Sequence, residues 1–494
     1  MEFITEPERQ IPILKRADVV VAGGGPAGLI AAVSAARAGA ETVLIERHGF
    51  LGGMATAGMV VTLGGVNHDA PPHRRVVGGI PFELLERMAA MGGAENHDGW
   101  IVQFEPEAFK AVADDLAQEA GVYLLLHSYV TAPIVQAGIV KGLVVENKNG
   151  RQAILAHTVI DATGDGDIAA RAGVPFDKSA SLQPMTMAFK VRGVRRPMVE
   201  LPGWSAEQAA RRQESQDLWR AWRGSAQAPR YLHRGLDIPP VPADILRYPG
   251  DEAGPDKPNP QTNTIMMMFE MREAAQRGEL PSFFGPGLFG LDEDELTVLC
   301  DHVFGDASDA EELTRAEVQG RRDARQFLEF WRAHFDVFRD SELAQTGPHI
   351  GIRESRRIVG EYVLTEQDVL AGRIFDDTVA LGCWPVDVHG PVREAGQEAG
   401  AVGMNRWEAV KEPYGIPYRC LVPRGVDNLL VAGRCTSTTS GAFASTRVMG
   451  TCMALGQAAG LAAAMAARQQ QSPRAMDGVA LRQALARHGA IVAR

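Results

Sequence analysis

Short apolar runs and one helix-like stretch open the chain. Asp18–Ala22 is apolar and rich in β-branched valine, which is typical of a buried parallel strand. Pro26–Ala38 follows as a predicted helix, and Gly39 ends it. Thr42–Ile45 is a second short apolar run. The pattern therefore predicts a strand–helix–strand unit of an α/β fold.

A second pattern lies further along the chain. A helix is predicted over Phe104–Ala120, and Val130–Gln136 and Val140–Asn147 then alternate apolar and polar residues. Lys148–Arg151 provides a hairpin turn, and Gln152–Val159 is the return strand. We therefore expect a β-meander after the first helices.

The first strand and helix enclose a glycine motif. Gly23, Gly25 and Gly28 form G-x-G-x-x-G, with Pro26 and Ala27 inside it. The first glycine permits a tight turn, the second lets a pyrophosphate approach the backbone, and the third lets the helix pack on the strand. Glu46 closes the second strand, where an acidic side chain accepts hydrogen bonds from a ribose diol. The alternative is a glycine-rich turn that binds nothing.

Composition narrows the choice of partner and compartment. The 494 residues carry a net charge of −11, which argues against a nucleic-acid partner and gives no membrane signal. The length predicts two or three folding units. The sequence contains no run of about 18 apolar residues, which a membrane-spanning helix would need. The five cysteines form no C-x-x-C pair, which favours a reducing cytoplasm. The acidic run Asp161–Asp167 lacks the calcium-loop pattern, so no metal is predicted.

Several motifs together resemble one family. They read L-G-G-M-A-T after Glu46, A-T-G-D-G-D after a predicted strand, I-R-E-S-R-R-I-V-G-E-Y, and a C-terminal N-L-L-V-A-G-R. The chain resembles FAD-dependent oxidoreductases of the two-dinucleotide-binding flavoprotein type, and more distantly the tricarballylate- and fumarate-type dehydrogenases. The resemblance implies a Rossmann-like FAD-binding domain with a parallel sheet and β-meander, plus an inserted α+β substrate or cap domain.

The resemblance also implies which residues hold FAD. Near the N-terminus these are the glycine motif and the residues after it: Gly23, Gly25, Pro26, Ala27, Gly28, Glu46, Arg47, Gly52, Gly53, Met54, Ala55 and Val130. The other segments contribute Thr163, Gly164, Asp165, Gly433, Arg434, Gly450, Thr451, Cys452 and Met453. A polar linker, Ser437–Ser445, precedes a helix over Thr451–Ala467. The N–H groups of Gly450–Met453 would stabilise the anionic reduced flavin.

We expect the domains to be interleaved in the sequence. Residues 1–173 form the first part of the FAD-binding domain, with an excursion over 62–103. Residues 174–345 form the substrate or cap domain, which includes predicted helices over Trp204–Gly224 and Glu312–Phe335. Residues 346–423 face substrate and flavin, and 424–494 complete the FAD-binding domain.

Four residues are candidates for catalysis. Asp387 and His389 share one face of a strand, so the carboxylate can orient an imidazole that accepts a proton. The alternative is a structural Asp/His pair. Arg353 can anchor an anionic substrate, although it and its neighbours Arg356 and Arg357 fit an internal salt-bridge node as well. Tyr418 is either an acid or base, or a packed residue.

The predicted reaction is hydride transfer from a small polar organic substrate, at a C–OH, C–N or C–C bond, to N5 of the flavin. Oxygen or an external acceptor would reoxidise the flavin, and the chain would act in the cytoplasm, possibly as a homo-oligomer. One alternative is a reductase of C=C or C=N bonds that uses NAD(P)H or a partner protein. The other is a non-catalytic FAD-binding module.

Overall fold

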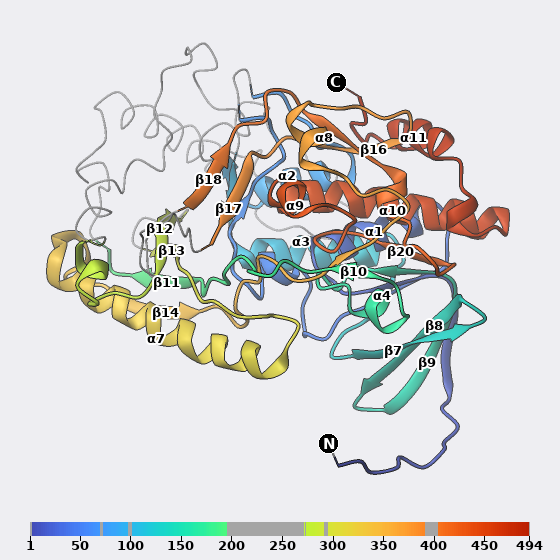
Figure 1. Ribbon diagram of the computed structural model, residues 1–494, viewed down its shortest axis with the longest axis horizontal. Helices are drawn as coiled ribbons and strands as arrows, with labels where there is room; N and C mark the ends of the chain where they lie inside the picture. The colour runs from blue at the N-terminus through green and yellow to red at the C-terminus, as the bar shows by residue number, and fades with distance from the viewer. Residues whose placement is uncertain are drawn as a thin grey trace.

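The computed structural model describes residues 2–69, 73–96, 101–194, 271, 273–290, 295–390 and 404–493. The helix predicted over Trp204–Gly224 lies outside these residues. Figure 1 shows the arrangement of the described elements.

A seven-stranded sheet is the centre of the molecule, and β1 (Ile13–Ala22) lies inside it. Strands parallel to one another run in the order β6 (Tyr123–Leu125), β2 (Thr42–Ile45), β1 and β9 (Gly150–Asp161). The last part of β9 also pairs in parallel with β20 (Leu429–Val431). Residues near both ends of the chain thus share one sheet.

The β-meander extends from the other half of β9. β8 (Ile139–Asn147) pairs antiparallel with β9 and with β7 (Tyr129–Gln136). Side chains of β1 alternate between two cores, because successive residues of a strand point to opposite faces. Val19 and Val21 pack with the helices, whereas Val20 and Ala22 pack with the meander. The predicted α/β fold with a parallel sheet and β-meander is confirmed.

Two helices cross closely above the sheet. Gly456 and Gly460 of α10 (Met449–Gln469) face α1 (Pro26–Arg37), and a Cβ at either glycine would lie 2.1 Å from the carbonyl oxygen of Ala27 or Ala31. Glycine is therefore what permits this approach. α10 is long and apolar enough to cross a bilayer, yet 94% of its most apolar window is buried inside the molecule. Packing against α1 and the sheet accounts for its apolar composition.

The excursion after the glycine motif adds a small sheet and one helix. Its strands are β3 (Thr62–Leu63), β4 (Ala94–Asn96) and β5 (Val102–Phe104), and α2 (Ile80–Ala90) lies between the first two in sequence. α3 (Pro106–Glu119) follows, close to the predicted bounds.

A second sheet stands apart from the first in Figure 1 and is covered by α7 (Ala310–His334). Its four strands are β12 (Phe283–Phe289), β13 (Glu295–Asp301), β11 (Phe189–Arg192) and β14 (Glu342–Thr346). Phe327 and Trp331 of α7 are buried against Phe189 and Phe283 of the sheet. These elements fall inside the predicted cap domain, whose boundaries stay a prediction.

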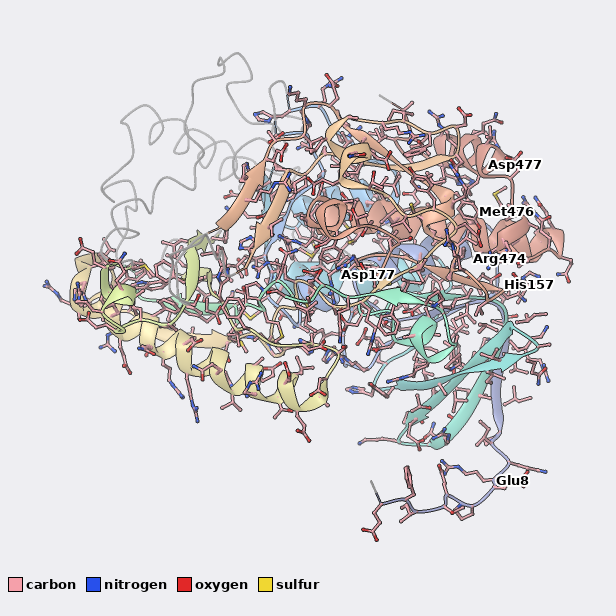
Figure 2. The ribbon with its side chains drawn as sticks, viewed as in Figure 1. Glu8, His157, Asp177, Arg474, Met476 and Asp477 are labelled. Carbon is pink, nitrogen blue, oxygen red and sulfur yellow. The ribbon has the colours of Figure 1, made fainter. Side chains whose placement is uncertain are left out.

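The remaining elements are short. They are η1 (Gly53–Ala55), α4 (Asp167–Arg171), β10 (Phe176–Asp177), η5 (Asp336–Phe338), β15 (Arg357–Ile358), α8 (Glu366–Leu370), β16 (Thr378–Gly382), β17 (Val386–His389), β18 (Met404–Glu408), β19 (Tyr414–Pro417), η6 (Tyr418–Cys420), α9 (Ser440–Thr446), η7 (Pro473–Ala475) and α11 (Gly478–Arg487). Met476 and Asp477, labelled in Figure 2, join the C-terminal helices, and Asp477 caps α11 through the N–H of Val479.

The predicted linker Ser437–Ser445 is wrong in part, because α9 occupies its second half. Thr439 caps this helix by accepting a hydrogen bond from the N–H of Ala442. Ala442, Phe443 and Ala444 are fully or almost fully buried. Tertiary packing therefore stabilises a helix that its serine, threonine and glycine content disfavours.

Candidate functional site

The glycine motif adopts the predicted tight turn between β1 and α1. Gly23 has a φ of +97°, and a Cβ at Gly28 would lie 1.8 Å from the Gly23 carbonyl oxygen. Gly25 differs, because a Cβ there would meet only Gly53 Cα, at 3.9 Å. The turn thus leaves open space above Gly25, where Pro26 and Ala27 begin the helix. That space is where the motif predicts a pyrophosphate.

Glu46 is held at the end of β2. Its carboxylate accepts hydrogen bonds from the N–H groups of Gly24, at 2.7 Å, and His48, at 2.8 Å. Burial raises its pKa, and these two donors oppose that effect. Each carboxylate oxygen can accept a further hydrogen bond, so the side chain is positioned to bind a diol.

The segment after Glu46 runs beside the glycine motif. Gly52 donates from its N–H to the Gly24 carbonyl at 2.8 Å, and a Cβ at Gly53 would lie 2.8 Å from Gly25 Cα. Met54 continues away from the motif, and its sulfur accepts a hydrogen bond from the N–H of Ile352 at 3.3 Å. Gly52, Gly53, Met54 and Ala55 therefore lead from the glycine motif toward the segment that contains Arg353.

Arg47 lies against His349, which sequence analysis did not single out. A guanidinium nitrogen of Arg47 is 2.9 Å from Nε2 of His349, and Nδ1 of His349 is 2.6 Å from the Ile350 carbonyl oxygen. Arginine can only donate and a carbonyl can only accept, so this histidine is neutral, with its hydrogen on Nδ1. Burial and Arg47 both lower its pKa.

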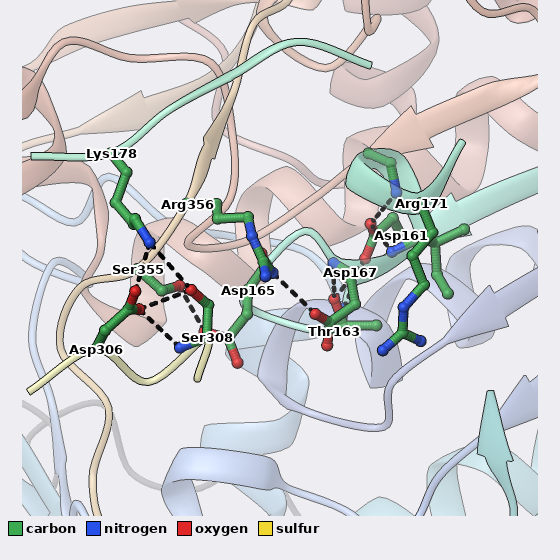
Figure 3. Close-up of polar contacts among 12 residues, drawn as sticks. Asp161, Thr163, Asp165, Asp167, Arg171, Lys178, Asp306, Ser308, Ser355 and Arg356 are labelled. Atoms are coloured by element: carbon green, nitrogen blue, oxygen red, sulfur yellow. Dashed lines mark hydrogen bonds and ion pairs between the residues drawn. The ribbon is translucent and has the colours of Figure 1, made fainter. Parts of the chain in front are cut away.

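The acidic loop after β9 is an internal network (Figure 3). Asp161 is fully buried and accepts hydrogen bonds from the hydroxyl of Thr163 and from the N–H groups of Ile168 and Ala169. Asp165 accepts hydrogen bonds from the hydroxyl of Ser355 at 2.6 Å and from Arg434 at 2.9 Å. Gly164 has a φ of +85° beside the Arg434 guanidinium. Two predicted segments, Thr163–Asp165 and Gly433–Arg434, are thus in contact.

Metal-ligating side chains do not gather in the described part of the chain: it contains no group of three or more His, Cys, Asp or Glu residues that could hold a metal ion.

The start of α10 offers fewer free N–H groups than the sequence predicts. The Gly450 N–H donates to the Gly64 carbonyl, and the Cys452 N–H donates to the Val448 carbonyl. The first bond forms because the loop at Gly64 and Gly65 packs against the helix start. The second is an ordinary helical bond to the residue four positions earlier. The Cys452 thiol also donates to the Arg447 carbonyl, and Met453 is buried in the core. Thr451 can still offer its side chain to a ligand, because the Thr451 hydroxyl has no hydrogen-bond partner among the described residues.

A buried polar cluster forms where β17 meets the second sheet. Nε2 of His389 lies 2.9 Å from Oδ1 of Asp387, and Nδ1 of His389 lies 3.2 Å from Nε2 of His302. Arg447 donates to Oδ2 of Asp387 at 2.8 Å. Sequence analysis predicted the Asp387–His389 pair but missed His302 and Arg447. Arg447 begins the R-V-M segment of the C-terminal family block, but the motif indicated no role for it. His302 belongs to no motif, and both residues lie far from Asp387 in the sequence.

Phe284 and Arg353 complete this cluster. The Phe284 ring stacks on His302 at 5.3 Å between centroids and meets His389 edge-on at 5.0 Å. The Arg353 guanidinium lies 5.5 Å from the Phe284 ring centre and donates to the Pro184 carbonyl and the Thr186 hydroxyl. Arg356 instead forms an ion pair with Asp167. Arg357 forms ion pairs with Glu354 and with Asp177, which is labelled in Figure 2. Of the three neighbouring arginines, Arg353 is the one in the cluster.

Electrostatics keep both imidazoles neutral. Burial, followed by Arg353, lowers the pKa of His389 to about 4 and that of His302 to about 2. Burial acts to raise the pKa of Asp387, but His389, Arg447 and Arg353 hold it well below its usual value. At neutral pH the cluster thus carries a carboxylate and two guanidinium groups. Burial raises the pKa of the nearby Asp301 well above its usual value.

Two predicted residues lie apart from these groups. The Tyr418 hydroxyl donates to the Pro473 carbonyl at 2.8 Å, and the ring is buried in the core. Burial raises the pKa of Tyr418 far above its usual value, which fits the packed alternative. Val130 pairs with Val145 in the meander, and its carbonyl accepts a hydrogen bond from Arg171.

Comparison with protein families decides the chain's membership. The model of the FAD dependent oxidoreductase family matches residues 18–485. The chain belongs to this family. It is therefore an FAD-dependent oxidoreductase, and FAD is the cofactor that the family implies.

Individual relatives match parts of this FAD-dependent oxidoreductase. Dihydrolipoyl dehydrogenase of Trypanosoma brucei brucei is 33% identical over 199 residues, which are 40% of this chain and 39% of that enzyme. Digeranylgeranylglycerophospholipid reductase 2 of Methanopyrus kandleri is 28% identical over 172 residues, which are 34% of this chain and 42% of that reductase. The chain thus spans about two fifths of these relatives.

A solved structure of a geranylgeranyl bacteriochlorophyll reductase-like protein from Thermoplasma acidophilum is 13% identical, with a TM-score of 0.44. The match covers 96% of this chain and 83% of the other.

The residues of this oxidoreductase fit FAD. Gly25 leaves room for a diphosphate, and Glu46 presents a carboxylate for a ribose. Nη1 of Arg434 and the hydroxyl of Thr451 are buried and have no hydrogen-bond partner among the described residues. Such groups are costly unless a ligand satisfies them. Both lie in segments that the family resemblance assigned to the cofactor.

Proposed function

We propose that this FAD-dependent oxidoreductase removes a hydride from a small polar organic substrate, at a C–OH, C–N or C–C bond. Oxygen or an external acceptor would then reoxidise the enzyme. When bound, FAD would supply the two-electron acceptor for this chemistry. The observation that carries the proposal is the cluster of Asp387, His389, His302, Arg353 and Arg447.

The position of the cluster supports this role. Arg353 follows Ile352, whose N–H contacts Met54 in the segment that continues from the glycine motif. Arg447, which binds Asp387, lies two residues before α10 begins. Segments from both ends of the predicted cofactor site therefore converge on the cluster. A substrate bound there would lie beside the reactive end of the cofactor.

The charges of the cluster favour an anionic or hydroxyl-bearing substrate. Two guanidinium groups and one carboxylate leave one positive charge in a largely buried place. Arg353 donates two hydrogen bonds to uncharged oxygens, so its charge is available to a ligand. The neutral imidazoles of His389 and His302 can accept the proton that leaves a hydroxyl or amine.

We keep a reductase of C=C or C=N bonds, driven by NAD(P)H or a partner protein, as a second candidate. The partial similarity to a Methanopyrus reductase favours it. We also propose that the enzyme acts in the cytoplasm as a homo-oligomer.

Anaerobic titration of the purified, FAD-loaded protein separates the two reactions. The titrants are a panel of alcohols, amines and 2-hydroxy acids, and separately NADH and NADPH. Bleaching of the flavin bands by one class of organic compound supports the dehydrogenase or oxidase. Rapid bleaching by NADH or NADPH alone favours the reductase and contradicts the first proposal.

A further inference from the structure

The contacts that run from Asp387 to His302 indicate the proton positions of two histidines. Nε2 of His389 lies 2.9 Å from Oδ1 of Asp387 as an ion-pair contact. An ionised carboxylate repels a bare nitrogen at this distance, so Nε2 carries a hydrogen. A neutral His389 then has a bare Nδ1. Nε2 of His302 lies 3.2 Å from this Nδ1 and must donate to it. The hydrogen of a neutral His302 is thus on Nε2, which leaves its Nδ1 as a bare acceptor.

Both ring nitrogens of His389 are occupied by this chain. In contrast, His302 contacts His389 through Nε2, so Nδ1 of His302 lies outside this pair of contacts. His302 follows β13 and stacks on Phe284, with Phe304 edge-on at 6.0 Å. The free acceptor nitrogen of the cluster therefore belongs to His302, whereas His389 is enclosed between Asp387 and His302.

We propose that His302, rather than His389, accepts the proton of the substrate, and that His389 is the second member of a proton relay. The inference rests on the proposed oxidation and names its base. The O–H or N–H bond of the substrate breaks, and its proton binds Nδ1 of His302. The Nε2 proton of His302 passes to Nδ1 of His389. The substrate is oxidised by losing this proton together with a hydride, which reduces FAD.

The charges around the relay favour transfer in this direction. Arg353 disfavours a positive charge on either ring, and Asp387 stabilises one on His389. The pKa of His389, about 4, is above that of His302, about 2. A proton taken up by His302 is therefore more stable after transfer to His389. Gln183 fixes the backbone that carries His389, since its side-chain oxygen accepts from the main-chain N–H of His389 at 3.1 Å.

Two glutamine variants separate the roles. In H302Q the side-chain amide can still donate to His389 but cannot take up a proton. In H389Q the relay is broken but His302 keeps its free nitrogen. The measurement is single-turnover flavin reduction of the full FAD-loaded chain, without oxygen, by the alcohol, amine or 2-hydroxy acid that bleaches the wild-type flavin fastest.

We expect flavin reduction in H302Q to be about 10²–10⁴-fold slower than in wild type, with unchanged FAD content. The rate of flavin reduction in H389Q should fall by a smaller factor. Near-normal reduction in H302Q together with strong loss in H389Q would overturn the assignment of His302 and leave the proposed oxidation standing. A wild-type flavin that no compound of the panel bleaches would instead contradict the proposed oxidation.

The hydrogen positions can be measured without any substrate. Long-range ¹H–¹⁵N spectra of the ¹⁵N-histidine-labelled, FAD-loaded protein distinguish the two tautomers, and the H302Q and H389Q variants assign the signals. We expect both rings to be neutral at pH 7, with hydrogen on Nε2. A hydrogen on Nδ1 of His302 would overturn the inference, because no bare nitrogen would then face the substrate.

Discussion

Arg447 donates to Oδ2 of Asp387 at 2.8 Å and to the Asp387 carbonyl at 3.3 Å, which links the start of α10 to strand β17. Arg447 thus joins the start of α10, which the predicted cofactor site includes, to the carboxylate that orients His389. Replacing Arg447 should therefore alter the titration of Asp387.

Replacing Arg447 with glutamine should move the acid limb of the pH–rate profile upward, by about one pH unit. Arg447 lowers the pKa values of both Asp387 and His389, so its loss lets both groups bind protons at higher pH. The measurement is the rate of anaerobic flavin reduction between pH 4 and 8. Arg406→Gln is the control, because Arg406 lies on β18 and pairs with the exposed Glu366 and Glu408. Equal profiles in the two variants would contradict the coupling.

Gly25→Ala should keep the fold and lose FAD. The backbone of Gly25 has an ordinary φ of −67°, and a Cβ there would meet only Gly53 Cα, so the apoprotein tolerates it. The added methyl group would occupy the space that the diphosphate needs. Gly28→Ala is the contrasting variant, because its Cβ would collide with the Gly23 carbonyl oxygen.

Thermal unfolding and FAD content distinguish the two glycine variants. We expect normal unfolding without bound flavin for G25A, and failure to fold for G28A. A G25A protein that binds FAD with wild-type affinity would show that no phosphate approaches Gly25.

Glu46→Gln should weaken FAD binding by about 1–3 kcal/mol, which is a decrease of roughly 5- to 150-fold in affinity. The neutral amide can no longer accept charge-assisted hydrogen bonds from a ribose. Its NH₂ group would also face the N–H donor of Gly24 or of His48. The readout is the quenching of FAD fluorescence on titration with apoprotein. Glu41→Gln, at an exposed glutamate paired with Lys15, should bind FAD normally. Equal affinity of both variants and wild type would exclude Glu46 as a cofactor ligand.

Stability should fall as the pH drops from about 6.5 to about 4. Burial lowers the folded-state pKa of His389 and of His48 to about 4, from an ordinary value of 6.5. In this window the unfolded chain binds more protons than the native protein, so the free energy of unfolding decreases with falling pH. Each such group contributes a slope of up to about 1.4 kcal/mol per pH unit.

Urea unfolding at pH 4.5, 5.5 and 6.5 measures this slope. His389→Gln removes one titrating group, so its slope should be smaller than that of wild type by up to about 1.4 kcal/mol per pH unit. Identical slopes for the variant and wild type would mean that His389 is not held neutral by the fold.

The sequence predicted those elements whose pattern is local. The valine run of β1, the glycines before α1 and the spacing to Glu46 each reflect a short-range requirement, and the structure reproduces them. The capping box that begins α8, in which Thr365 and Asp368 bond each other's backbone N–H groups, is likewise a local feature. Such features depend on backbone geometry within one unit, so a single sequence reveals them.

Long-range contacts account for what was missed. His302 and Arg447 become part of the site only when β13, β17 and the start of α10 meet, and no spacing records that meeting. Arg356 and Arg357 could not be separated from Arg353 by composition, because only the fold shows which of them face carboxylates. For Tyr418 the sequence left an acid or base role and a packed role open, and only the fold shows its contact with Pro473.

The role of the buried cluster in substrate oxidation is tested most directly by Asp387→Asn in anaerobic single-turnover flavin reduction. The change keeps the shape of the side chain but removes the charge that orients His389 and stabilises its protonated form. We predict FAD content equal to that of wild type and flavin reduction slower by about 10²–10⁴-fold. Flavin reduction at the wild-type rate in this variant would contradict the account.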